Sequence, residues 1–112
     1  MSTNTLLKGT LQTIILKLLE DRKRMYGYEI SQKVKALTSG GIELTEAALY
    51  AALHKLEAAG LLETTTEMAG NRVRKYYHLT ESGGKEAISK VEEAKEFINQ
   101  LQLLLNLKPD LL

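Results

Sequence analysis

The stretch TEAALYAALHKLEAAGLLETTTEMAGNRVRKYYHLT, residues 45–80, changes its hydrophobic period once, from that of a helix to that of a strand. Thr45 can cap a helix, because its hydroxyl accepts hydrogen bonds from the free N–H groups of a first turn. Gly60 suits the left-handed residue that ends many helices. Between them, leucines recur on one helical face at Leu49, Leu53 and Leu56. The pattern predicts a helix of about four turns between Thr45 and Gly60.

After Gly60 the side chains alternate with a period of two. Residues 62–68 are rich in threonine, and residues 72–79 form a basic returning strand. Ala69-Gly70-Asn71 between them predicts a turn, because Gly and Asn tolerate positive φ. A capped helix that runs straight into such a hairpin is typical of a winged helix, which is a helix-turn-helix with an added β-ribbon.

Upstream, residues 6–19 predict a helix that is apolar over most of its circumference and therefore needs burial on two sides. Its own winged domain can cover one side, and the other is expected to need a further partner. Residues 30–37 predict a short amphipathic helix. The alternating segment 42–44 predicts the first strand of the sheet, which gives the order α-α-β-α-β-β. The run EDRKR, residues 20–24, is expected to be a solvated charged loop, with phosphate contact as the alternative.

A last helix is predicted from the cap at Thr80 to about Leu107, with Pro109 as its stop. Its apolar residues form a heptad seam with a second stripe beside it, so we expect it to dimerise, together with the first helix of the partner. The predicted dimer-interface residues are Leu7, Leu11, Ile15, Ala87, Val91, Ala94, Phe97, Ile98, Leu101, Leu104 and Leu105. The expected fold class is mainly α with a small β-hairpin, divided into a winged helix in residues 1–80 and a dimerisation helix with a short tail in residues 81–112.

The amino-acid composition and motifs argue against several classes of function. The 112 residues predict one domain, and the absence of cysteine excludes disulfides and thiolate metal sites. With two histidines, no thiol and none of the motifs HExxH, GxSxG or a phosphate-binding glycine loop, an enzyme is not expected, nor is a metal or cofactor. No apolar run is long enough to span a bilayer, and no secretion signal precedes the first helix, so a cytoplasmic protein without a membrane partner is expected.

The net charge of +1 is unevenly spread. Residues 1–80 hold 11 Lys or Arg and 8 Asp or Glu, a balance of +3, whereas residues 81–112 hold 4 and 6, a balance of −2. The positive excess lies where the winged helix would meet a nucleic acid, and a dimer would double it. The excess is modest for a nucleic-acid binder, and it is the winged-helix pattern together with this charge that makes double-stranded DNA the expected partner.

The predicted DNA-binding residues lie on the outer face of the 45–60 helix and around the hairpin turn: Thr45, Ala47, Tyr50, His54, Lys55, Asn71, Arg72, Arg74 and Lys75. For each of them a structural role is the alternative. Thr45 can be only a cap, Tyr50 a surface tyrosine that packs on a neighbour, and Asn71 a turn former. Arg72 and Arg74 have the spacing expected of phosphate or minor-groove contacts, and the alternative is a solvated hairpin arm.

Three motifs resemble the PadR family of transcriptional regulators over residues 6–105. They are Tyr26-Gly27-Tyr28-Glu29-Ile30, then Leu49-Tyr50 followed by Leu53-x-Lys55-Leu56-Glu57-x-x-Gly60-Leu61, and last Arg74-Lys75-Tyr76-Tyr77-x-Leu79-Thr80-Glu81-x-Gly83. The resemblance implies a homodimeric repressor that binds an inverted repeat, with the 45–60 helix in the major groove and the 69–75 turn in or near the minor groove. Many members have proline where this chain has Ala51.

Some short members of that family bind drugs in a pore at the dimer interface, and they stack planar ligands on a tryptophan of the last helix. This chain has no tryptophan; Ala94 takes the equivalent position, with Phe97 as the nearby aromatic residue. The small residues Ala87 and Ala94 on the seam suggest room for an apolar or aromatic effector. The competing function is a dimeric winged helix that binds another protein without recognising an operator.

Overall fold

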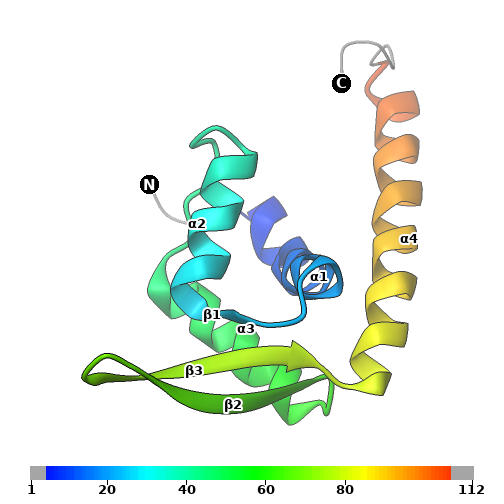
Figure 1. Ribbon diagram of the computed structural model, residues 1–112. Helices are drawn as coiled ribbons and strands as arrows, with labels where there is room; N and C mark the ends of the chain where they lie inside the picture. Colours follow the sequence, from blue (N-terminus) through cyan, green and yellow to red (C-terminus); the bar gives the residue numbers. More distant parts are fainter. Residues whose placement is uncertain (1–4, 107–112) are drawn as a thin grey trace.

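The computed structural model describes residues 5–106, which form four helices and a three-stranded antiparallel sheet (Figure 1). In chain order the elements are α1 (Thr5–Asp21), β1 (Met25–Tyr26), α2 (Gly27–Leu37), α3 (Glu46–Ala58), β2 (Leu62–Ala69), β3 (Arg72–Leu79) and α4 (Glu81–Leu104). The predicted fold class, mainly α with a small β-hairpin in a winged-helix arrangement, is confirmed. Helix α4 ends at Leu104, before the end predicted at about Leu107, and the predicted stop at Pro109 lies outside the described residues.

Helix α3 begins and ends where the sequence predicts. The Thr45 hydroxyl accepts a hydrogen bond from the Ala48 N–H at 3.1 Å, which satisfies one of the free donors of the first turn. At the other end Gly60 has a φ of +79°, a value that costs glycine little and other residues more. Leu49, Leu53 and Leu56 are all buried, so one face of the helix is fixed against the core.

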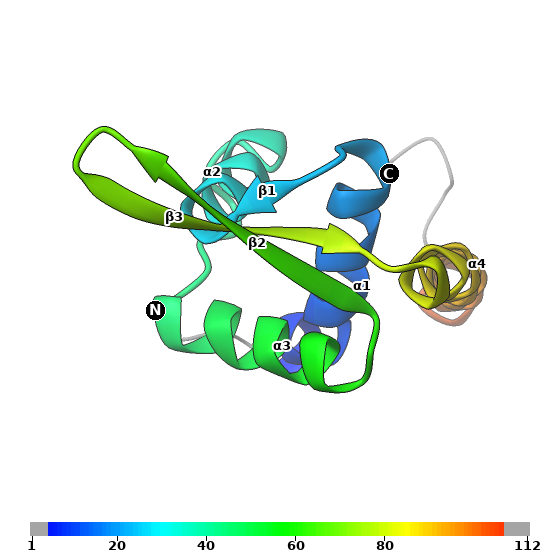
Figure 2. The same cartoon turned by 60° about the horizontal axis from the view of Figure 1, so that its bottom comes forward.

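The sheet has the strand order β1-β3-β2. Strands β2 and β3 pair from Leu62 with Leu79 to Ala69 with Arg72, and Gly70, with a φ of +66°, takes the first position of a two-residue turn. This hairpin, residues 62–79, is called the wing below. Its tip and α4 lie at opposite ends of the molecule (Figure 2).

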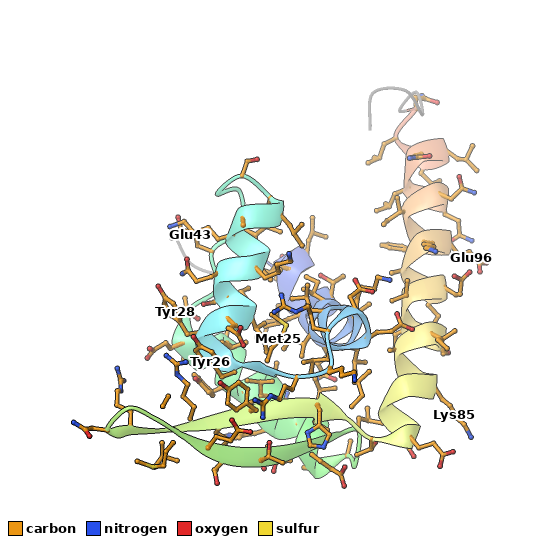
Figure 3. All side chains as sticks on the ribbon, in the orientation of Figure 1. Met25, Tyr26, Tyr28, Glu43, Lys85 and Glu96 are labelled. Carbon is orange, nitrogen blue, oxygen red and sulfur yellow. The ribbon has the colours of Figure 1, made fainter. Side chains whose placement is uncertain are left out.

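The predicted strand at residues 42–44 is wrong, because the third strand is β1, which pairs with Tyr76 and Tyr77 of β3. The observed order is therefore α-β-α-α-β-β. Ile42 and Leu44 are partly buried and pack against the core, and the Ile42 N–H donates to the Thr38 hydroxyl at 3.0 Å instead of joining a ladder. Alternation in that segment reflects core packing of a loop. In Figure 3, Met25 lies among the core side chains beneath α1, and Tyr26 lies beside the sheet at the foot of α2.

Helix α1 is buried on two sides, as expected, but both sides are covered within one chain. It lies between the α2 and α3 side and α4 (Figure 1). Four predicted dimer-interface residues are consequently buried in the single chain: Leu7, Leu11, Ile15 and Ala87. A side chain that is buried within its own chain has little accessible surface for contact with a partner. These four residues therefore belong to the core of the single chain.

The start of α4 is joined closely to the end of α3. The Thr80 hydroxyl accepts from the Gly83 N–H at 3.0 Å and donates to the Gly60 carbonyl at 2.7 Å. A Cβ on Gly83 would lie 2.0 Å from the carbonyl oxygen of Leu61, whereas a Cβ on Gly84 would meet nothing within 4 Å. Only the first of the two glycines is required by packing.

This contrast gives a stability prediction. We expect Gly83→Ala to lower the free energy of unfolding by about 2 kcal/mol, because backbone atoms cannot move aside as a flexible side chain would. The matched change Gly84→Ala should raise it by about 0.5–1 kcal/mol through better helix propensity. Urea unfolding at equal protomer concentration measures both values. Equal effects of the two variants would contradict the close approach at Leu61.

Candidate nucleic-acid interface

Two hollows border the exposed side of α3. The first, of about 570 Å³, lies between the starts of α2 and α3 and strand β3, and is lined by Tyr26, Gly27, Tyr28, Glu46, Tyr50, Arg72, Val73, Arg74, Lys75 and Tyr77. The second, of about 440 Å³, lies between α1 and α3, and is lined by Lys8, Leu11, Gln12, Thr45, Ala47, Ala48, Ala51, Ala52 and Lys55. Seven of the nine predicted DNA-binding residues thus line one hollow or the other.

The outer face of α3 carries small and polar side chains. Ala47, Ala51, His54 and Lys55 are all exposed, and the only carboxylate in the first turn is that of Glu46. His54 lines neither hollow. A helix with such a face can approach a DNA groove closely, because short side chains leave room for base edges and phosphates.

Tyr50 lies between α3 and α2. A Cβ on Gly27 would lie 2.3 Å from the Tyr50 hydroxyl oxygen, so the end of the ring rests against the first residue of α2. The side chain is still 39% exposed and lines the first hollow. Tyr50 therefore packs on a neighbouring helix, which was the structural alternative, and its contact with DNA stays a prediction.

The three predicted cations of the wing have different surroundings. The guanidinium carbon of Arg74 lies 4.3 Å from the centroid of the Tyr26 ring, a cation–π distance. Lys75 Nζ lies 4.0 Å from a carboxylate oxygen of Glu57 on α3, which offsets part of its charge. Within the described residues Arg72 has no carboxylate partner, and Asn71 is an exposed turn residue outside both hollows. Arg72 and Arg74 are therefore the more available of the three cations.

Arg24 is the residue that the sequence did not single out. It lies in the segment expected to be a solvated loop, but its Nη1 and Nη2 donate to the two carboxylate oxygens of Glu67 on β2, the second bond at 3.1 Å. Its guanidinium carbon also lies 4.0 Å from the centroid of the Tyr76 ring. Three adjacent basic residues look alike in sequence, and only the folded hairpin brings a partner 43 residues away to one of them.

The Arg24 hydrogen bond holds the pKa of Glu67 below its ordinary value of 4.5. Because the folded-state pKa is lowered, the stabilisation is present above pH 4.5 and is lost as the pH falls through the lowered value. We expect an NMR titration of the Glu67 carboxyl carbon to have its midpoint below 4.5 and to return toward that value in Arg24→Gln. The neighbouring change Lys23→Gln should leave the midpoint in place. An unshifted midpoint in the wild-type chain would contradict the pairing.

Residues 5–106 contain no group of three or more His, Asp or Glu side chains arranged to hold a metal ion. Nor is any helix of this part of the chain both long and apolar enough to cross a membrane. The surface formed by α3 and the wing therefore stands as the candidate site.

Comparison with known proteins gives consistent matches. Residues 15–89 match the sequence profile of the Transcriptional regulator PadR-like family. An uncharacterized protein from Lysinibacillus sphaericus is 34% identical over 103 residues, which cover 88% of this chain and 94% of that one. The structure of a transcriptional regulator from Clostridium thermocellum is 30% identical, with a TM-score of 0.78 over 92% of this chain and 96% of that one. A PadR family transcriptional regulator from Eggerthella lenta is 29% identical, with a TM-score of 0.73 over 92% and 88%.

Proposed function

This chain belongs to the PadR-like family of transcriptional regulators, and on that premise we propose that it is a homodimeric repressor that binds an inverted repeat in double-stranded DNA. Its family and its structural neighbours are transcriptional regulators and not enzymes, which makes it a DNA-binding regulator. The proposal adds repression, the dimer, the inverted repeat and a cytoplasmic place of action.

The observation that carries the proposal is the continuous surface made by α3 and the wing. The exposed face of α3 carries Lys55 and is bordered on one side by Arg72 and Arg74 of the wing and on the other by Lys8 of α1. A helix that enters the major groove needs cations on both flanks, because the phosphate backbones of the duplex rise on either side. The positions of these cations support α3 as the helix that contacts the base edges and the wing as a phosphate or minor-groove contact.

The dimer is supported by the exposed apolar half of α4. The face of α4 that α1 covers at Ala87 continues beyond the place where the two helices cross, to Ile98, which is 54% exposed, and to the C-cap residue Leu105, which is 62% exposed. The Cα radius of gyration is 15.2 Å, against about 13 Å for a compact chain of this length, because α4 projects from the rest (Figure 1). An apolar helix face of this length favours a second copy as its cover.

The proposal also includes release from DNA by a small apolar or aromatic molecule. Ala87, which suggested room at the seam, is buried within its own chain, so only the half-buried Ala94 and the exposed Phe97 remain as its basis. We propose that such a ligand would stack on Phe97 between the two copies of α4. A planar apolar dye that binds the protein and weakens its DNA affinity would support this idea, and unchanged DNA affinity in saturating dye would reject it.

Salt dependence separates this function from a protein-interaction module. Each phosphate contact lowers the logarithm of the binding constant by about 0.9 per unit of log salt concentration, so several contacts give a steep slope. We expect such a slope from fluorescence anisotropy of a random-sequence duplex titrated with the protein. Absence of duplex binding at low salt would favour the protein-interaction alternative.

A further inference from the structure

Arg24 spans the sheet. It precedes β1 at one edge, its guanidinium lies over Tyr76 of the central strand β3, and its hydrogen bonds end at Glu67 on β2 at the other edge. The Tyr26 and Tyr76 rings meet edge to face at 5.5 Å, and Arg74 stacks on Tyr26. The side chain thus joins all three strands of the sheet.

The contact between Arg24 and Glu67 lies near the point where the third strand of the sheet ends. Strand β1 pairs only with Tyr76 and Tyr77, so residues 67–74 form a two-stranded ribbon without a third strand. Met68 and Val73 pair across that ribbon and are each 66% exposed, so packing holds it weakly. An isolated two-stranded hairpin is marginally stable in water. Arg24 therefore binds the wing at Glu67, just beyond the part of the sheet that has three strands.

We propose that Arg24 is a positioning residue that fixes the direction of the wing before DNA is bound. The inference rests on the proposed function, because the direction of the wing decides whether Arg72 and Arg74 meet the duplex when α3 enters the groove. Its own charge is matched by Glu67, so Arg24 acts through the wing and not as a phosphate contact. Ordering a binding segment in advance removes part of the entropy cost of association.

Glu67→Gln separates positioning from simple electrostatics. Removing an acid near a DNA-binding surface strengthens binding if only net charge matters. If Glu67 serves to hold Arg24, its loss frees the wing, and we expect affinity for a random-sequence duplex to fall about fivefold. Glu63→Gln is the matched control, since Glu63 lies on the same face of the same strand and faces His78, and not Arg24. It should bind as well as, or slightly better than, the wild-type chain.

Arg24→Gln should weaken binding by a similar factor and leave the slope of log affinity against log salt unchanged. A slope reduced by about 0.9 would identify Arg24 as a direct phosphate contact and overturn the proposal. Tighter or unchanged binding by Glu67→Gln would overturn it as well. Thermal unfolding should change little in either variant, because exposed ion pairs contribute little to stability.

Hydrogen exchange of the DNA-free protein tests the same point independently of DNA. The amides of residues 67–74 should exchange faster in Arg24→Gln and Glu67→Gln than in the wild-type chain, with those of α3 unchanged. Equal exchange in the ribbon would contradict the proposal even if all three proteins bind DNA. A wild-type chain that binds no duplex but shows the exchange difference would reject the proposed function and keep the role of Arg24 in ordering the wing.

Discussion

Ala51→Glu is expected to weaken duplex binding by about 100-fold at physiological salt. Ala51 lies in the middle of the exposed face of α3, so a carboxylate there would face the phosphates that the wing and Lys55 attract. Like charges brought together at an interface cost several kcal/mol, and each 1.4 kcal/mol is a factor of ten in affinity. The fold should be kept, since a carboxylate four residues before Lys55 suits a helix. Anisotropy titrations with a fixed duplex give the affinity.

Two controls accompany this prediction. Ala51→Gln has the same shape without the charge and should lose much less affinity. Ser89→Glu adds the same charge on the exposed surface of α4 and should bind nearly as the wild-type chain does. Comparable losses in Ala51→Glu and Ser89→Glu would mean that only net charge matters and that α3 does not lie against the duplex.

The double variant Ile98→Glu with Leu105→Glu is expected to convert a dimer into a folded monomer. Ile98 lies on the apolar face of α4 and Leu105 is the C-cap residue that directly follows the helix. Both are exposed within one chain, so the change leaves the core untouched. Burying carboxylates between two helices costs far more than the contact returns. Sedimentation equilibrium measures the mass, and loss of the second subunit should weaken binding to an inverted repeat by about 100-fold.

Asn99→Glu provides the matched control, because Asn99 is exposed on the other side of the same helix. It should remain dimeric and bind DNA. A wild-type chain that sediments as a monomer at all concentrations would contradict the proposed dimer, and a double variant that stays dimeric would place the interface elsewhere.

The parts of the fold that the sequence predicts correctly are those governed by local rules. The cap at Thr45, the left-handed Gly60 and the leucine spacing between them define α3 without reference to the rest of the chain. The strand at Met25–Tyr26 could not be found in this way, because two residues have no measurable period and pair only after the wing has formed. The alternation in residues 42–44 misled for the converse reason, since a loop that packs on a core also alternates.

The burial of α1 could be predicted from the sequence only in part. Its broad apolar surface correctly predicts two covered sides, but periodicity does not say whether the cover comes from the same chain or from a partner. The structure gives α4 of the same chain as one cover, and Leu11 and Ile15, which were predicted at the dimer interface, are buried in the core of the single chain. The sequence also does not distinguish the paired glycines at the start of α4. The contact of Gly83 with Leu61 depends on the direction in which α4 leaves the sheet.

For the candidate site, residue type and face were sufficient to place most of the predicted residues around α3 and the wing. Contacts between distant segments were not accessible from the sequence, which is why the packing of Tyr50 on Gly27 and the pairing of Arg24 with Glu67 emerge only in three dimensions. The DNA contacts themselves stay predictions that the proposed variants test.

The most direct test of the repressor proposal is to capture random genomic duplex fragments with the purified wild-type chain at two salt concentrations and to sequence them. The proposal predicts enrichment of an inverted repeat whose half-sites lie about one helical turn apart, weakened at the higher salt and lost with Ala51→Glu. Fragments without any shared sequence under every condition would contradict operator recognition by α3.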